Sequence, residues 1–85
     1  MVKALLVRGD EAAAIPWLDR VIAEDPLLEE AHRLLMSAYG RAGERSLAMR
    51  TYDQCVAVLA EELGVEPLAE TTALWQQIQT AGKRL

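Results

Sequence analysis

Glu29-Glu30-Ala31-His32 is the first stretch of this 85-residue chain whose residue types could do chemistry. It contains Glu-x-x-His, the spacing with which carboxylate di-iron bundles place two ligands on one helix face. Such a site needs a second Glu-x-x-His and two further carboxylates, and His32 is the only histidine of the chain. We therefore expect no metal site, and we expect His32 to be a partly buried, hydrogen-bonded residue at a helix interface.

The single cysteine, Cys55, is the second candidate. A thiol nucleophile needs a base beside it, and the helix expected around Cys55 carries no histidine. Cys55 follows Tyr52 by one turn on an apolar stripe, which predicts a small core residue. No Gly-rich phosphate loop, catalytic carboxylate pair or Ser/His/Asp set can be assembled. We expect neither an enzyme nor a bound cofactor.

A stripe of polar residues is a better candidate for binding. Glu30, Arg33, Ser37 and Arg41 lie at i, i+3, i+7 and i+11, beside an apolar stripe of the same helix. Two arginines on one helix face could hold a carboxylate or an acidic segment of a partner protein. An ordinary solvated helix face would show the same spacing. Reversing both arginine charges is expected to abolish peptide capture while leaving the packing of the domain largely unaffected.

Helices must position these residues. One apolar stripe recurs at i, i+3, i+4, i+7 and i+8: Ala31, Leu34, Leu35, Ala38 and Tyr39. A second follows the same period: Ala48, Tyr52, Cys55, Val56, Leu59 and Leu63. β-branched and aromatic residues are sparse, and no alternating run appears. The pattern predicts an all-α fold.

Proline and glycine mark the expected helix boundaries. Asp25-Pro26 predicts an N-cap and a first-turn proline for a helix that runs to about Ala42, where Gly43 ends it. The next helix is expected from about Arg45 to Leu63. Gly64 is a natural left-handed residue after it, with Val65 folding back onto Leu59 or Ala60. Pro67 is expected to open a last helix that ends near Ala81.

The first part of the chain is less regular. A helix is expected from about Glu11 to Glu24, and Pro16 must either bend it or delay its start. The helix before it is expected to be short, from about Lys3 to Arg8. The apolar residues Leu5, Leu6 and Val7 therefore look like the end of a longer element, and we expect the chain to be a fragment of a larger protein.

The chain repeats itself with a period of 34 residues. Five pairs of similar residues fall on one another: Gly9 and Gly43, Ala14 and Ala48, Ile15 and Met49, Leu18 and Tyr52, and Val21 and Cys55. A helical hairpin explains them, because the glycine turns the chain and the small alanine lets two helices approach. This pattern resembles the tetratricopeptide repeat (TPR), with about two repeats and a C-terminal capping helix.

Longer motifs give a narrower resemblance. The run Glu24-Asp25-Pro26-Leu27 with Glu30-Ala31-His32-Arg33-Leu34-Leu35-Met36 looks like the bacterial transcriptional activator domain. So do Ala42-Gly43-x-Arg45 and Glu61-Glu62-Leu63-Gly64-Val65-Glu66-Pro67. In Streptomyces antibiotic regulatory protein-type activators this domain follows a winged-helix DNA-binding domain, and elsewhere it accompanies signalling ATPases. The resemblance implies a regulatory module, without DNA binding by these residues.

Charge and composition agree with that reading. The net charge of −4 argues against direct nucleic-acid binding. Residues 24–30 carry four acids and residues 51–70 carry five, with no lysine or arginine in either run. No apolar stretch is long enough to span a membrane, and the lone cysteine suits a reducing cytoplasm.

Two surfaces are expected to associate with other proteins. Leu5, Leu6 and Val7 lack the cover of a full first helix, which predicts self-association into a homo-oligomer through that end. Trp75 on the last helix either caps the core or stays partly exposed to dock a neighbouring domain. The leading hypothesis is a regulatory, protein-interaction domain of a bacterial transcriptional regulator. The alternatives are a free-standing TPR-like adaptor for acidic peptide segments and a sensor segment of a signalling ATPase.

Overall fold

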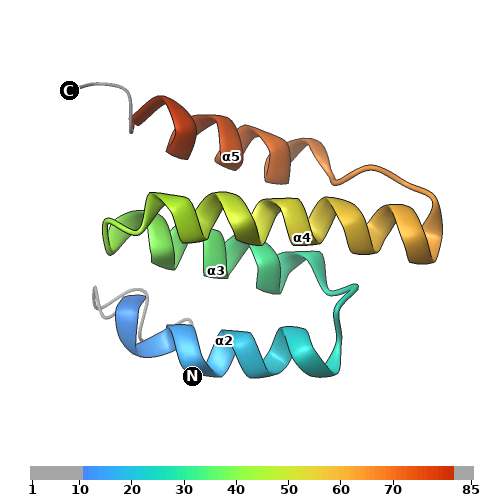
Figure 1. The fold of residues 1–85 in the computed structure, drawn as a ribbon, viewed down its shortest axis with the longest axis horizontal. Helices are drawn as coiled ribbons and strands as arrows, with labels where there is room; N and C mark the ends of the chain where they lie inside the picture. The colour runs from blue at the N-terminus through green and yellow to red at the C-terminus, as the bar shows by residue number, and fades with distance from the viewer. Residues whose placement is uncertain (1–10, 82–85) are drawn as a thin grey trace.

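Four antiparallel helices make up the part of the chain that the structure describes, residues 11–81 of a computed structural model (Figure 1). Their bounds are α2 Glu11–Glu24, α3 Glu29–Arg41, α4 Arg45–Leu63 and α5 Ala69–Ala81. The central helix α3 packs against each of the other three, and α4 also packs against α5. The all-α prediction is confirmed, and the arrangement is a TPR-like stack. The stub predicted at Lys3–Arg8 lies outside the described residues.

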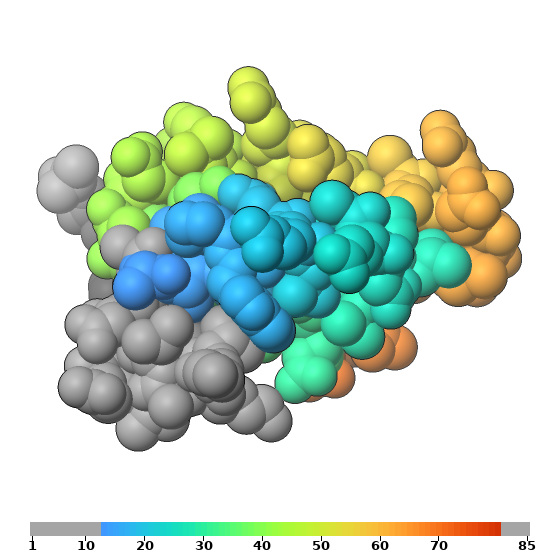
Figure 2. Space-filling view, turned by 90° about the horizontal axis from the view of Figure 1, so that it is seen from below, coloured from blue at the N-terminus to red at the C-terminus, as the bar shows by residue number. Residues whose placement is uncertain are grey.

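Small and large apolar residues alternate in the core as the repeat predicts. Ala14 and Ala48, the paired alanines, are both completely buried. Leu18 and Leu35 pack with Ala14 into one cluster, against which Leu34 and Tyr39 lie. Seen from the α2 side, this helix and its connection to α3 cover the core (Figure 2).

Both predicted glycine turns are confirmed. Gly43 has a φ of 81° and Gly64 a φ of 65°, in the left-handed region that side chains with a Cβ rarely adopt. After Gly64 the backbone returns to α4, because the Val65 N–H donates to the Leu59 carbonyl over 3.3 Å. The Val65 side chain itself is exposed. These turns set the antiparallel order of α3, α4 and α5.

Two predicted helix starts are wrong. The helix expected from Asp25-Pro26 begins at Glu29, because residues 25–28 form a turn in which the Leu28 N–H donates to the Asp25 carbonyl over 3.1 Å. The Pro26 carbonyl is also held outside the helix, by the His32 ring at 2.8 Å. The helix expected from Pro67 begins at Ala69 for a similar reason, since the Leu68 N–H is bonded to a side chain of α3.

Pro16 lies inside α2, and the helix begins at Glu11 as the apolar pattern predicts. A delayed start was one of the two consequences expected of Pro16, and it is wrong. The proline costs α2 one backbone hydrogen bond, since it has no N–H to donate to the carbonyl of Ala12.

Leu63 is the one residue of the predicted α4 stripe that the core leaves out. Its side chain is 56% exposed, although Ala48, Cys55 and Leu59 on the same stripe are buried. The reason is length: α4 has 19 residues and α3 only 13. At about 1.5 Å per residue, the last turns of α4 extend beyond α3 and have no helix beneath them.

Candidate protein-interaction site

A polar network joins α3 to the start of α5. One carboxylate oxygen of Glu29 accepts the Leu68 N–H at 2.6 Å and the Thr71 hydroxyl at 2.5 Å. The Arg33 guanidinium donates to the Thr71 Oγ1 at 3.0 Å, and lies 4.0 Å from Glu29 and 3.8 Å from Glu70. Thr71 is completely buried, so this part of the network lies in the interior of the α3–α5 contact. Glu29 thus caps a helix 39 residues further along the chain.

The predicted polar stripe is divided by this network. Arg33 is bound within the domain, and only 21% of its side chain is exposed. Glu30 and Arg41 are exposed, and Ser37 is half-buried between them. Reversing the charge of Arg33 would break its contacts with α5, so the expectation that the double reversal leaves the packing unaffected is wrong. A change at Arg41 alone leaves the contacts of Arg33 with α5 in place.

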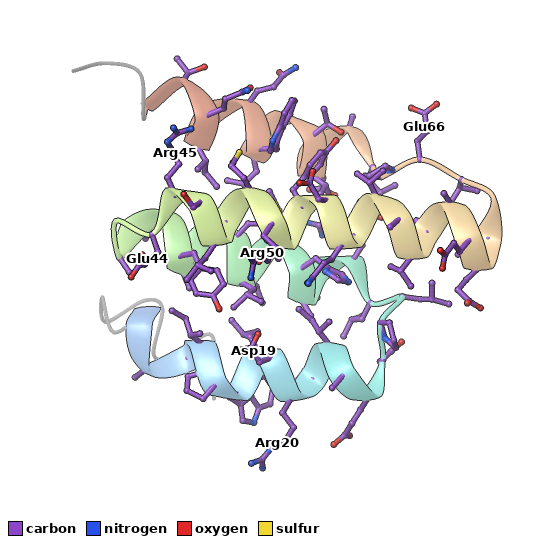
Figure 3. The ribbon with its side chains drawn as sticks, viewed as in Figure 1. Asp19, Arg20, Glu44, Arg45, Arg50 and Glu66 are labelled. Carbon is purple, nitrogen blue, oxygen red and sulfur yellow. The ribbon has the colours of Figure 1, made fainter. Side chains whose placement is uncertain are left out.

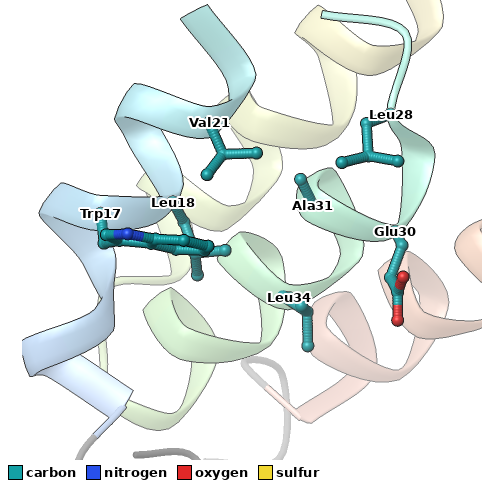
Figure 4. Close-up of a pocket in the computed structure, with 7 residues that line it drawn as sticks. All are labelled: Trp17, Leu18, Val21, Leu28, Glu30, Ala31 and Leu34. Carbon is teal, nitrogen blue, oxygen red and sulfur yellow. The ribbon is translucent and has the colours of Figure 1, made fainter. Parts of the chain in front are cut away.

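An apolar groove opens between α2 and α3 (Figure 4). It has a volume of about 150 Å³, and seven residues line it: Trp17, Leu18, Val21, Leu28, Glu30, Ala31 and Leu34. Glu30 is the only charged residue among them. Trp17 and Leu28 stand at its sides with 49% and 41% of their surfaces exposed. Sequence reasoning missed this groove, because neither apolar stripe predicts which of its residues remain uncovered.

The 34-residue repeat shows what the groove corresponds to. Trp17 and Val21 on α2 are equivalent to Thr51 and Cys55 on α4. Thr51 is 4% exposed and Cys55 is fully buried, because α4 packs against both α3 and α5. In the described part of the chain, α2 packs closely against α3 alone. In the repeat, α3 fills the corresponding place beside α4 and α5, and the segment 34 residues before α3 overlaps the helix predicted at Lys3–Arg8, which lies outside the described residues.

Trp75 packs between the last two helices. Its ring stacks on that of Tyr52, with the centroids 4.9 Å apart and the planes 13° from parallel. The Tyr52 hydroxyl also lies 3.2 Å from the Thr72 hydroxyl. Trp75 thus covers part of the core while remaining half-buried. Its partners on the association surface, Leu5, Leu6 and Val7, lie outside the described residues, so that surface stays a prediction.

His32 and Cys55 both have the roles predicted for them. His32 is 2% exposed, and its Nε2 donates to the Pro26 carbonyl at 2.8 Å. Cys55 is buried, and burial raises the pKa of its thiol from 9.0 to about 11, with the Glu29 carboxylate adding to the shift and Arg33 opposing it. A thiol that stays protonated at neutral pH is a poor nucleophile. Over residues 11–81, no group of three His, Cys, Asp or Glu side chains could hold a metal ion.

The buried thiol should make stability depend on pH. Between pH 9 and about 11 the unfolded chain loses the Cys55 proton and the folded chain keeps it. The free energy of unfolding must therefore fall as the pH rises through this window. A Cys55→Ala variant should lose less over the same range. Burial, Asp19 and Glu44 raise the pKa of Tyr39 in both proteins, so the comparison isolates the thiol. Parallel denaturant-unfolding curves for the two proteins would contradict this account.

None of the described helices is both long and apolar enough to cross a membrane.

Comparison with known proteins places the fold in a family. The model of the bacterial transcriptional activator domain matches residues 1–79. The regulatory protein AfsR of Streptomyces griseus is 39% identical over 77 residues, which are 91% of this chain and 8% of that protein. The transcriptional regulator RedD of Streptomyces coelicolor is 37% identical over 67 residues, 79% of this chain and 19% of RedD.

A solved structure agrees with these sequence matches. Mycobacterium tuberculosis EmbR, in complex with a low affinity phosphopeptide, superposes with a TM-score of 0.91 at 28% identity. The match covers 94% of this chain and 21% of that one, so the chain spans a small part of the length of each relative. By sequence and by fold, the chain belongs to the bacterial transcriptional activator domain family found in transcriptional regulators of the AfsR and RedD type.

Proposed function

We propose that residues 1–85 are one regulatory, protein-interaction domain of a larger bacterial transcriptional regulator that works in the cytoplasm. The domain acts through contacts of its helix stack with a neighbouring domain or a partner protein, and DNA binding belongs to other parts of the regulator. The observation that carries this proposal is the apolar groove between α2 and α3. Its apolar lining gives a helix of a neighbouring domain or of a partner protein a surface to bury.

The energetics favour an occupied groove. Trp17 alone presents a large, half-exposed aromatic surface, and burying about 100 Å² of apolar area is worth about 2.5 kcal/mol. Aromatic residues in pockets of this kind often dominate the affinity of an interface. A helix that enters the groove would contact α2 and α3 together. Because α3 also packs against α4 and α5, binding of that helix could change the positions of α4 and α5 through α3.

The polar stripe is a second proposed contact. Ser37 and the exposed Arg41 lie two turns and three turns along α3 from Glu30, which lines the groove. An acidic segment of the same partner could reach Arg41, whereas Arg33 serves the α3–α5 contact. We also retain the proposal that Leu5, Leu6 and Val7, together with Trp75, support self-association.

One alternative function has an observation in its favour. A free-standing adaptor for acidic peptides is consistent with the phosphopeptide present in the EmbR complex, although the match covers only 21% of that chain. The third reading is a sensor segment of a signalling ATPase. The coding sequence around these 85 codons separates the three. A winged-helix domain upstream supports the transcriptional reading, a nucleotide-binding ATPase supports the sensor, and nearby stop codons on both sides support the adaptor.

Cross-linking tests the groove directly. A photoreactive side chain in place of Trp17, in the intact regulator, should cross-link to a helix outside residues 1–85. The same group in place of Ala57, which is exposed on α4, serves as the matched control and should give no such product. Mass spectrometry of the cross-linked peptides reads out the partner. Cross-links from position 17 that stay within residues 1–85 would rule out the proposed contact.

A further inference from the structure

Exposed apolar side chains gather at one end of the stack. Of the six large apolar residues that are exposed within the described chain, all but Trp17 lie in or beside two connections, α2–α3 and α4–α5: Leu27, Leu28, Leu63, Val65 and Leu68. Both connections lie at the same end of the molecule, on the right in Figure 1, and meet at one edge in Figure 2. The hydrogen bond from the Leu68 N–H to Glu29 ties them together.

The same end is strongly acidic. Five exposed acids surround these apolar residues along the chain: Glu24, Asp25, Glu61, Glu62 and Glu66. No lysine or arginine occurs in residues 21–32 or 51–70, and the nearby Arg33 is bound to Glu29, Thr71 and Glu70. We call this surface the acidic end, defined by these five acids with Leu27, Leu63, Val65 and Leu68. The two acidic runs of the sequence are thus brought together by the fold.

The opposite end of the stack has another character. Arg41 and Arg45 flank the α3–α4 turn, where Glu44 is the only acid, and Figure 3 shows Arg45 and Glu44 far from Glu66. None of the exposed large apolar residues of the described chain lies at that turn. The α3–α4 turn of a second copy could therefore offer the acidic end positive charge but no exposed large apolar residue. Two acidic ends facing each other would repel.

We infer that the acidic end is a docking surface for a basic segment of a partner protein, a helix or loop that carries lysines or arginines around apolar anchors. The exposed leucines and Val65 supply apolar area, and the acids beside them along the chain supply charge, the two components from which a protein interface is built. The acids steer a basic partner and reject acidic ones. This surface includes neither Trp17 nor Arg41. Because it is acidic, it binds a basic segment, whereas the peptide considered above for Arg41 is acidic.

Binding of a designed peptide tests the inference. The probe is a fluorescein-labelled helical peptide of lysine, alanine and leucine, about 14 residues and so about four turns long. Its binding to the 85-residue chain is followed by fluorescence anisotropy in about 0.15 M salt, where distant charges are screened. We expect Glu62→Gln and Leu68→Ser each to weaken binding roughly tenfold. Glu44→Gln, the matched loss of one acid at the other end, should leave binding unchanged.

The outcomes distinguish a defined binding site from nonspecific electrostatic attraction to a negatively charged domain. Equal weakening by Glu62→Gln and Glu44→Gln would mean that only net charge matters, and would overturn the inference. So would binding that Leu68→Ser leaves intact, or equal binding of a peptide with the same composition scrambled to remove its apolar face. Leu68 is 54% exposed and Glu62 is exposed, so both variants should fold, which circular dichroism checks. A failure of the Trp17 cross-link would leave this result unaffected, because the two experiments concern different surfaces.

Discussion

Replacing Leu18 with alanine is expected to lower the free energy of unfolding by about 2–5 kcal/mol. Leu18 is 1% exposed and packs with Ala14 and Leu35 in the cluster that joins α2 to α3. Truncation removes buried apolar surface and leaves a cavity that two packed helices can fill only in part. Each kcal/mol should lower the melting temperature of a domain of this size by about 4–8 °C.

Leu63→Ala is the matched control for Leu18→Ala. It removes the same atoms from a side chain that is 56% exposed, and should cost less than about 0.5 kcal/mol. Chemical denaturation of both variants gives the comparison. Equal losses for the two substitutions would contradict the core described here, since they would place position 63 in an environment as buried as position 18.

Replacing Glu29 with alanine is expected to cost about 1.5–3 kcal/mol, because its carboxylate accepts two hydrogen bonds and lies near a guanidinium. The loss should be local. Amides of α5 should exchange with solvent faster, while those of α4 keep their protection, since Glu29 holds the start of α5. Hydrogen-exchange mass spectrometry over the two helices measures both effects.

Two further variants serve as comparisons for Glu29→Ala. Glu29→Gln keeps one acceptor oxygen and loses the charge, so its effect should fall between those of wild type and Glu29→Ala. Glu30→Ala removes the neighbouring exposed carboxylate and leaves the bonds from Leu68 and Thr71 to Glu29 in place, so it should cost less than Glu29→Ala. An unchanged exchange rate in α5 of Glu29→Ala would show that the capping bond does not hold that helix.

The sequence predicted those features of the fold that depend on residues close together in the chain. Gly43 and Gly64 end their helices because only a residue without a Cβ adopts their φ values at little cost. The apolar stripes likewise predicted Ala31, Leu35, Cys55 and Leu59 as core. The starts at residues 26 and 67 were wrong because the proline signal is local, whereas the hydrogen bonds that decide those starts come from His32 and Glu29.

The candidate site was harder to predict for the same reason. Arg33 was expected to face a partner, and the structure pairs it with Thr71, 38 residues away. No spacing within one helix reveals such a pairing. The acidic end likewise depends on two connections that only the antiparallel order brings together. Leu63 shows the limit of periodicity, since a stripe predicts which face of α4 is apolar and says nothing of how far α3 extends beneath it.

The central claim is that this domain regulates transcription through its helix stack. Its most direct test is transcription from a promoter controlled by the intact regulator, measured with Trp17→Glu and with Ala57→Glu as the matched surface control. The charge in the groove should lower transcription by roughly tenfold or more while the melting temperature and the amount of protein stay unchanged. Wild-type transcription from a folded Trp17→Glu regulator would contradict the claim.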